Sequence, residues 1–193
     1  MEQTKKAIYF LNQLQMLKNT SRTGWLTILA PDESVAEHTY RTAMIGLLIA
    51  KMLNLKKEQQ LEVVVGCLLH DIEECYIGDL HKIAQNYLKT DKRKLQKKLL
   101  DELPKELKED YKKFLNPKNK ENKKIKEIIM DADRLECALT AKYYLDLGYK
   151  TEDWIKNSSA LLNTDIAKNL LEEINRIKTI EWIKENKKAD KKG

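Results

Sequence analysis

The chain has 193 residues, of which 34% are charged, a net charge of +6, and only six glycines and three prolines. This length suits one domain with a buried core, and we expect that domain over residues 1–186, with a basic, frayed tail over 187–193. No apolar run is long enough to predict a membrane-spanning helix, and the N-terminus lacks the pattern of a signal peptide. We therefore expect a cytoplasmic protein. The three cysteines are widely spaced, which argues against a disulfide framework, and Cys67 and Cys137 are expected to be small buried side chains.

Basic side chains gather in residues 89–126 and in the tail, and the remainder of the chain is net acidic. This distribution is typical of a solvated surface, although a basic rim that draws anionic substrates inward is an alternative. Because the charge lies outside the motifs described below, it does not predict a nucleic-acid partner.

The spacing of apolar residues predicts an all-α chain. Residues 19–32 and the loop containing Trp154 are expected to be non-helical. The valines at 63–65 are compatible with a strand, but their polar lead-in and the length of the segment favour a helix. The helices are expected over residues 3–18, 35–53, 58–74, 79–89, 91–116 (one or two helices, interrupted near Pro104), 123–147 and 164–186.

Ser34 and Glu37 predict a capping box at the start of the second helix. The apolar character of that helix on nearly every side predicts that it is central and buried.

Polar residues whose burial is energetically unfavourable lie in or beside three apolar helices. His38 opens the helix over 35–53, His70 and Asp71 are adjacent in the helix over 58–74, and Asp131 and Asp133 lie within the helix over 123–147. Each residue alone is more often a satisfied core residue than a ligand. Together they favour one buried metal site, because a buried carboxylate is costly unless it is paired or bound to metal. Nitrogen and oxygen ligands suit one divalent ion among Mn, Co, Ni, Fe, Zn and Mg. The third histidine, His81, is expected near a helix start at the surface or at the pocket edge.

The segments RTGW, ESVAEH, HDIEECYIGDL and MDADRLECAL, in this order, resemble the HD-domain superfamily. Within it they resemble the branch that contains the bacterial 5′-deoxynucleotidases and the related oxetanocin-phosphate hydrolases, and the resemblance covers about residues 10–150. It implies an HD-domain helical bundle, commonly dimeric, with a buried metal held by His38, His70, Asp71 and Asp133. Asp133 is preferred to Asp131 because it lies two residues before a hydrophobe, as the acid of the family does. Asp131 then either supports the ligands or caps the pocket.

The resemblance also implies catalytic and substrate-binding residues. Glu74 is expected to transfer a proton or orient water, and Asp79 to act on the leaving-group side, with a helix cap as its alternative role. Arg22 is expected to bind the phosphate, and Trp25 to pack on the sugar near the pocket mouth and disfavour a 2′-hydroxyl. Two residues separate Arg22 from Trp25, whereas some family members have the pair adjacent, so strict selection of deoxyribose does not follow.

The resulting hypothesis is a metal-dependent phosphomonoesterase that acts on nucleoside 5′-monophosphates, with deoxynucleotides as the expected substrates. One alternative is an HD phosphohydrolase acting on cyclic nucleotides, triphosphates or alarmones. Another is a non-catalytic HD-fold interaction module, which could bind nucleic acid through residues 89–126. We expect a homodimer and no membrane partner.

Overall fold

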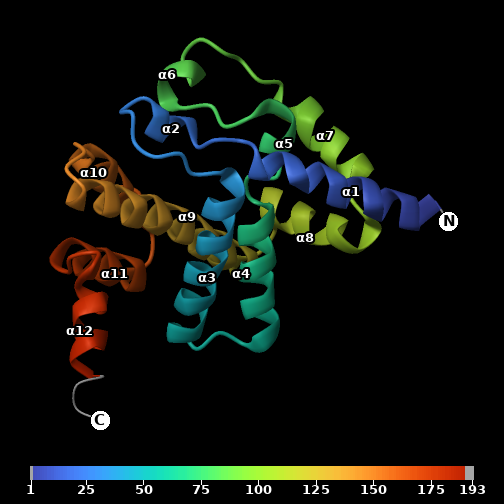
Figure 1. Cartoon of the computed structure of the whole chain (residues 1–193). Helices are drawn as coiled ribbons and strands as arrows, with labels where there is room; N and C mark the ends of the chain where they lie inside the picture. The colour runs from blue at the N-terminus through green and yellow to red at the C-terminus, as the bar shows by residue number, and fades with distance from the viewer. Residues whose placement is uncertain (1, 190–193) are drawn as a thin grey trace.

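The computed structural model describes residues 2–189, which form twelve helices (Figure 1). No strand occurs within these residues, and one isolated antiparallel bridge joins Ser21 to Ser34. The all-α prediction is confirmed. In chain order the helices are α1 (Glu2–Lys18), α2 (Thr23–Leu26), α3 (Val35–Met52), α4 (Lys57–Leu69), α5 (Glu74–Ile77), α6 (Lys82–Gln85), α7 (Lys92–Glu102), α8 (Lys105–Leu115), α9 (Lys120–Asp146), α10 (Glu152–Ser159), α11 (Asp165–Arg176) and α12 (Glu181–Ala189).

The long helix α9 is the central element and packs against α3, α4, α10 and α11. Figure 1 shows α3 and α4 side by side, with α9 running across them. Close packing of α3 on α4 depends on Gly46, where a Cβ atom would lie 2.7 Å from Cys67 Sγ and 3.0 Å from Val63 Cγ1. The three helices that carry the histidines and acids are therefore in direct contact.

A smaller apolar cluster lies beneath α1, α7 and α8. Phe10, Leu69, Leu99, Leu103 and Tyr111 are its most deeply buried members, together with Ile72. This cluster holds the C-terminal end of α4 and the turn that follows it. The basic stretch over 89–126 supplies apolar residues to this cluster, and none of its described Lys and Arg side chains is buried, as predicted for a solvated surface.

Two segments predicted to be irregular are helical. Residues 23–26 form the short helix α2, and the loop containing Trp154 is helix α10. The apolar spacing in these short segments is too brief to reveal a helix, and their packing supplies the missing stabilisation. Trp25 is buried between other aromatic rings, and Ile155 and Ser158 of α10 are buried against α9.

The predicted helix over 164–186 is divided into α11 and α12. Ile177 has an extended backbone, with φ −90° and ψ 134°, which ends α11. The backbone N–H of Thr179 then donates to Asp146 Oδ2 at 2.8 Å, so the connecting turn is fixed to the end of α9. Other boundaries differ by a few residues: α4 ends at Leu69, and the helix expected over 79–89 is limited to α6.

The predicted division into a domain over 1–186 and a tail over 187–193 stays a prediction. Helix α12 continues to Ala189, and residues 190–193 lie outside the described part of the chain. None of the described helices has the length and apolar character needed to cross a bilayer.

Candidate functional site

His38 is positioned by the predicted capping box at the start of α3. The Ser34 hydroxyl accepts a hydrogen bond from the backbone N–H of Glu37, and the Glu37 carboxylate accepts one from the Ser34 backbone N–H. These bonds satisfy free backbone groups at the helix start and fix its first turn. The His38 side chain is fully buried and points toward α4 and α9.

His70 and Asp71 lie where α4 ends. His70 retains a helical backbone immediately after Leu69, and a series of turns leads from Asp71 to α5. The His70 Nδ1–H donates to the carbonyl oxygen of Cys67 at 2.7 Å. Because a carbonyl oxygen only accepts, this bond fixes the ring tautomer and leaves a lone pair on Nε2.

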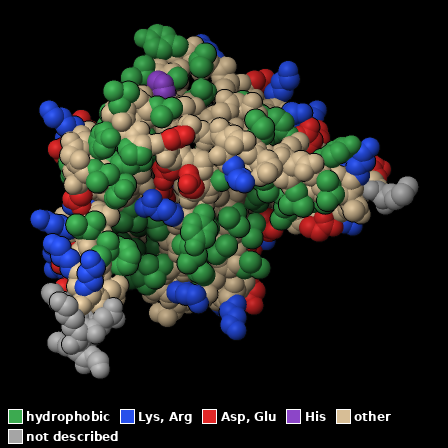
Figure 2. Space-filling view, viewed as in Figure 1, with side chains coloured by type: hydrophobic (Ala, Val, Ile, Leu, Met, Phe, Trp, Pro, Cys, Tyr) green, Lys and Arg blue, Asp and Glu red, His purple; other side chains and the backbone are tan. Residues whose placement is uncertain are grey.

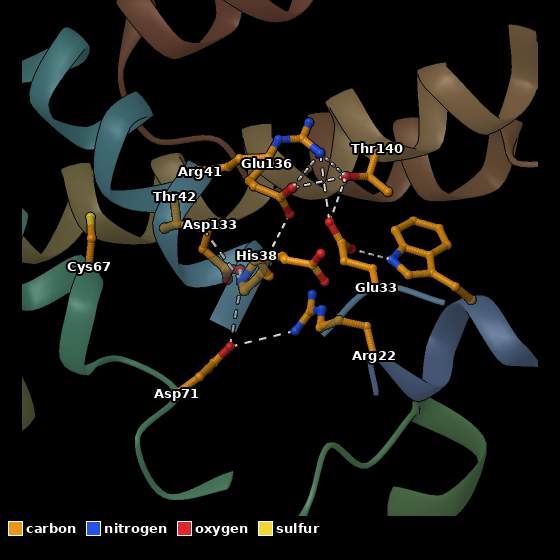
Figure 3. Close-up of polar contacts among 12 residues, drawn as sticks. Arg22, Glu33, His38, Arg41, Thr42, Cys67, Asp71, Asp133, Glu136 and Thr140 are labelled. Atoms are coloured by element: carbon orange, nitrogen blue, oxygen red, sulfur yellow. Dashed lines mark hydrogen bonds and ion pairs between the residues drawn. The ribbon is translucent and has the colours of Figure 1, made fainter. Parts of the chain in front are cut away.

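Asp133 reaches the same point from α9 (Figure 3). Its Oδ1 atom lies 3.2 Å from His38 Nε2 and 3.7 Å from His70 Nε2. Asp71 Oδ2 lies 3.5 Å and 3.1 Å from the same two nitrogens, which are 3.3 Å apart. One ligand atom from each of His38, His70 and Asp71 lies within 4.8 Å of the others, and Asp133 completes the set. The four predicted ligands are therefore brought together.

This set of atoms fits a divalent cation. His38 Nδ1–H donates to Glu136 Oε2 at 2.5 Å, so the Nε2 lone pairs of both imidazoles point into the space between the carboxylates. Burial and Arg22 lower the pKa of His38, but its bonds to Asp133 and Glu136 outweigh them and raise that pKa to about 9. The site thus stabilises positive charge. Two nitrogen and two oxygen donors, without a thiolate, suit several divalent ions.

Arg22 lies beside this cluster, with Nη1 3.5 Å from Asp71 Oδ2 (Figure 3). Burial alone would lower the pKa of Arg22, but Asp71, Asp133 and Asp79 raise it. The pKa of Glu74 is also raised, but for a carboxyl this favours the neutral form. Burial, followed by Asp71 and Asp79, raises the pKa of Glu74 from its ordinary value to about 8, and its Oε2 atom is buried without a hydrogen-bond partner. The charged guanidinium of Arg22 and the protonatable carboxyl of Glu74 therefore share one site.

Asp79 is tied to the segment that carries Arg22. Its Oδ2 atom accepts hydrogen bonds from Thr23 N at 2.5 Å and Thr23 Oγ1 at 3.1 Å. Thr23 Oγ1 also accepts from the backbone N–H of His81 at 3.1 Å. Asp79 does not cap α6, because His81 does so through Nδ1. Thr23 thus joins the Arg22 segment to the α5–α6 connection.

A cavity of about 610 Å³ extends from the four-residue cluster. Its walls come from the segment around α2, the α5–α6 region, α9 and α10. No residue of 89–126 is among the described residues that line it, so the basic stretch does not form its rim. Six of the eight predicted site residues line the cavity, namely Arg22, Trp25, Asp71, Glu74, Asp79 and Asp133, whereas His38 and His70 are not among the lining residues.

Trp25 is more deeply buried than expected for a residue at a pocket mouth. Its side chain is 2% exposed, its Nε1–H donates to Glu33 at 2.8 Å, and its ring contacts Tyr144 and Trp154. Trp154, from α10, is half-buried and also lines the cavity. The α10 wall was missed by sequence reasoning, because its Asp153, Trp154 and Asn157 belong to no recognised motif.

Two acids on α9 have roles that were not predicted from the sequence. Asp131 is fully buried, and its carboxylate accepts bonds from the backbone and side chains of Asn163 and Thr164 at 2.7–2.9 Å. It therefore anchors the start of α11, and its Oδ1 atom also lies 3.8 Å from Nη1 of Arg134, which lines the cavity. Glu136, which orients His38, was not predicted. Glu136 lies three residues after Asp133 in an apolar helix, so the two acids share one helix face, and this spacing could have indicated that Glu136 lies near the site.

The described residues form an all-helical fold with a His/Asp cluster that could hold a metal ion at the end of a cavity. The family model described as HD domain matches residues 14–175, and the chain belongs to this family. It is 28% identical to the 5′-deoxynucleotidase HDDC2 of Dictyostelium discoideum, over 74% of this chain and 80% of that one. It is 30% identical to a 5′-deoxynucleotidase of Yersinia pseudotuberculosis, over 68% of this chain and 71% of that one.

A solved structure shares the fold at lower identity. It is the HD phosphohydrolase DatZ of cyanophage S-2L, bound to dA and one catalytic Zn²⁺ ion. The likeness has a TM-score of 0.55 and 16% identity, and it covers 86% of this chain and 94% of DatZ.

Proposed function

We propose that this protein is a metal-dependent phosphomonoesterase that converts nucleoside 5′-monophosphates, preferably deoxynucleotides, into nucleoside and inorganic phosphate. One observation carries the proposal: the four His and Asp ligand atoms converge at a cavity that also holds a buried arginine and a carboxyl of raised pKa. The two relatives named 5′-deoxynucleotidases support this substrate class.

His38, His70, Asp71 and Asp133 would hold one divalent cation, and the donor set leaves Mn, Co, Ni, Fe, Zn and Mg open. When bound, the cation polarises the phosphoryl group and lowers the pKa of the water that attacks phosphorus. The Zn²⁺ ion in DatZ supports a divalent ion in this fold.

The remaining side chains divide the reaction between them. Arg22 binds phosphoryl oxygens and offsets the charge that develops as the water oxygen bonds to phosphorus and the bond from phosphorus to O5′ breaks. Glu74 orients the water or delivers a proton to O5′, since a carboxyl with a pKa of about 8 is protonated near neutral pH. Asp79 has one oxygen engaged by Thr23, and its other oxygen serves the leaving-group side.

The nucleoside would occupy the part of the cavity bordered by α10. Trp25 would act there chiefly by supporting Trp154, whose ring centroid is 5.7 Å away. Trp154, held in place by Trp25, would pack on the sugar and disfavour a 2′-hydroxyl.

The test is phosphate release from a panel of deoxy- and ribonucleoside 5′-monophosphates by metal-stripped protein resupplied with Mn²⁺, Co²⁺, Mg²⁺ or Zn²⁺. We expect release that requires metal, is faster with deoxynucleotides, and is lost in Asp71→Ala. Asp101→Ala, at an exposed position of α7, is the matched control and should retain the activity of the unchanged protein.

Failure of the folded protein to release phosphate with any of these metals would overturn the nucleotidase proposal. Release from cyclic nucleotides or triphosphates alone would establish a different HD phosphohydrolase. Metal-independent binding of nucleic acid, unchanged in Asp71→Ala, would establish an interaction module instead.

A homodimer is also proposed. Tyr40, Met44, Leu48 and Met52 recur every fourth residue along α3, and each side chain is 45–66% exposed. Figure 2 shows apolar side chains over α3 on this face. Light scattering coupled to size-exclusion chromatography tests the dimer, which a monomer at micromolar concentration would contradict. A cytoplasmic location and the absence of a nucleic-acid partner stay predictions.

A further inference from the structure

A buried polar network lies on the side of His38 away from the cavity (Figure 3). The Nδ1–H of His38 donates to Glu136 Oε2 at 2.5 Å. The other carboxylate oxygen, Oε1, accepts from Thr140 Oγ1 at 2.9 Å and lies 3.3 Å from Arg41 Nη1. Glu136 is fully buried, so the orientation of the His38 ring depends on these partners.

A second branch leads from Arg41 to the substrate segment. Arg41 Nη1 lies 3.7 Å from Glu33 Oε1, and Glu33 Oε2 accepts the indole N–H of Trp25 at 2.8 Å. Glu33 is 7% exposed, and its backbone carbonyl accepts from the backbone N–H of Arg22 at 2.7 Å. Glu33 therefore touches both residues assigned to substrate binding.

The Nη1 atom of Arg41 thus lies between the buried carboxylates of Glu33 and Glu136. Glu33 Oε1 and Glu136 Oε1 lie 3.7 Å and 3.3 Å from the same Arg41 nitrogen, so two carboxylates of like charge face each other across it. A buried carboxylate left without its partner is strongly unfavourable. Arg41 pairs with both and donates to Thr140 Oγ1 at 3.1 Å, while its own side chain is 41% exposed. It reaches this position from α3, three residues after His38.

We propose that Arg41 is a positioning residue for the metal site. It acts on His38 through Glu136, and it couples that site to Trp25 through Glu33. The guanidinium holds the two carboxylates at a fixed separation, so the imidazole and the indole keep their relative placement. The inference rests on the proposed function for the role of Trp25, whereas its metal-binding part stands on the geometry of His38.

The test compares Arg41→Met, which retains the length of the side chain and removes its charge, with Arg41→Lys, which restores a cation. Calorimetric titration of the metal-stripped proteins with Mn²⁺ is the primary readout. Loss of the direct partner of a ligating histidine typically weakens metal binding about 10–100-fold, and because Arg41 acts on His38 through Glu136, the loss expected for Arg41→Met is about 10-fold. Arg41→Lys should recover most of the affinity.

A second substitution, Glu33→Gln, distinguishes a positioning role of Arg41 from general damage to the fold. Glu33→Gln retains an oxygen that accepts from Trp25 but removes the charge that repels Glu136. In the Arg41→Met background it should therefore restore Mn²⁺ affinity at least in part. Arg176→Met, at an exposed position of α11, is the matched control and should bind Mn²⁺ like the unchanged protein.

Deoxy- and ribonucleotide hydrolysis supplies the second readout. Arg41→Met should lower the ratio of kcat/KM for deoxy- over ribonucleotides, because the indole is no longer fixed relative to the metal ligands. Unchanged Mn²⁺ affinity in Arg41→Met would overturn the inference, and so would an affinity loss that neither Arg41→Lys nor Glu33→Gln corrects. If the unchanged protein binds Mn²⁺ without releasing phosphate, the proposed function fails and the Mn²⁺ titrations still decide the role of Arg41.

Discussion

The Nε2 atoms of His38 and His70 lie 3.3 Å apart, and the Nδ1 atom of each ring is engaged on the opposite side, by Glu136 and by the carbonyl of Cys67. With both Nδ1 atoms engaged on the far side, the two Nε2 atoms face each other between Asp71 and Asp133. A divalent cation bound there would replace the proton that these carboxylates otherwise favour on the rings, with Asp71 and Asp133 as the counter-charges.

Metal binding should therefore stabilise the folded protein through His70. At a Mn²⁺ concentration about 100 times the dissociation constant, the unfolding free energy should rise by about 2.7 kcal/mol. His70→Ala should abolish this gain, because the ligand set loses one of its two nitrogens. Thermal unfolding with and without Mn²⁺ measures the effect, and an equal gain in His70→Ala would contradict the site.

Glu74 should make the metal-free protein less stable as pH rises. Its pKa is raised from an ordinary value of 4.5 to about 8, so the folded state binds more protons than the unfolded state between these values. Below pH 4.5 the carboxyl is protonated in both states, and above pH 8 it is ionised in both. Relative to Glu74→Gln, the unchanged protein should lose stability across this window.

Urea unfolding of the two metal-free proteins at pH 5 and pH 8 measures this difference. Glu127→Gln, at an exposed position of α9, is the control and should follow the unchanged protein. A difference between Glu74→Gln and the unchanged protein that stays constant from pH 5 to pH 8 would show that the Glu74 carboxyl is not perturbed.

Thr23 should be needed to hold the Arg22 segment. Thr23→Val removes the hydroxyl that bonds Asp79 and accepts from the His81 N–H, and each lost bond costs about 0.5–1.5 kcal/mol. We expect a higher KM for nucleotide with a smaller change in kcat, since the segment carries the phosphate-binding arginine. Thr23→Ser retains the hydroxyl and should behave like the unchanged protein. Equal KM values in all three proteins would rule out this role.

Asp131 should matter for stability and not for metal binding. Asp131→Ala leaves the backbone N–H groups of Asn163 and Thr164 without their acceptor, at a cost of roughly 1–3 kcal/mol for each group that stays buried. Chemical denaturation should register this loss, while calorimetry should give an unchanged Mn²⁺ affinity. A weaker Mn²⁺ affinity at full stability would instead place Asp131 among the groups that support the ligands.

Much of the fold and site could be predicted from local sequence. The Ser34–Glu37 capping box depends on residues three positions apart, and it is present in the structure as expected. Pro104 separates α7 from α8 as predicted, because proline disfavours the helical conformation in the residue before it. The short helices α2 and α10 could not be predicted, since neighbouring helices rather than apolar periodicity stabilise them.

The sequence by itself determined which residues could be ligands, because His38, His70, Asp71 and Asp133 lie in or beside apolar helices, where burial of such groups is unfavourable, and match one motif. Only the tertiary structure decided which side chains bond to these ligands on the side away from the metal site. Glu136 is matched to His38 across 98 residues of sequence, and Arg41 to Thr140 across 99. Such partners leave no local periodicity, because their selection depends on how α3 and α9 cross. The packing of those two helices therefore decides how the imidazole of His38 is oriented and which charges surround it.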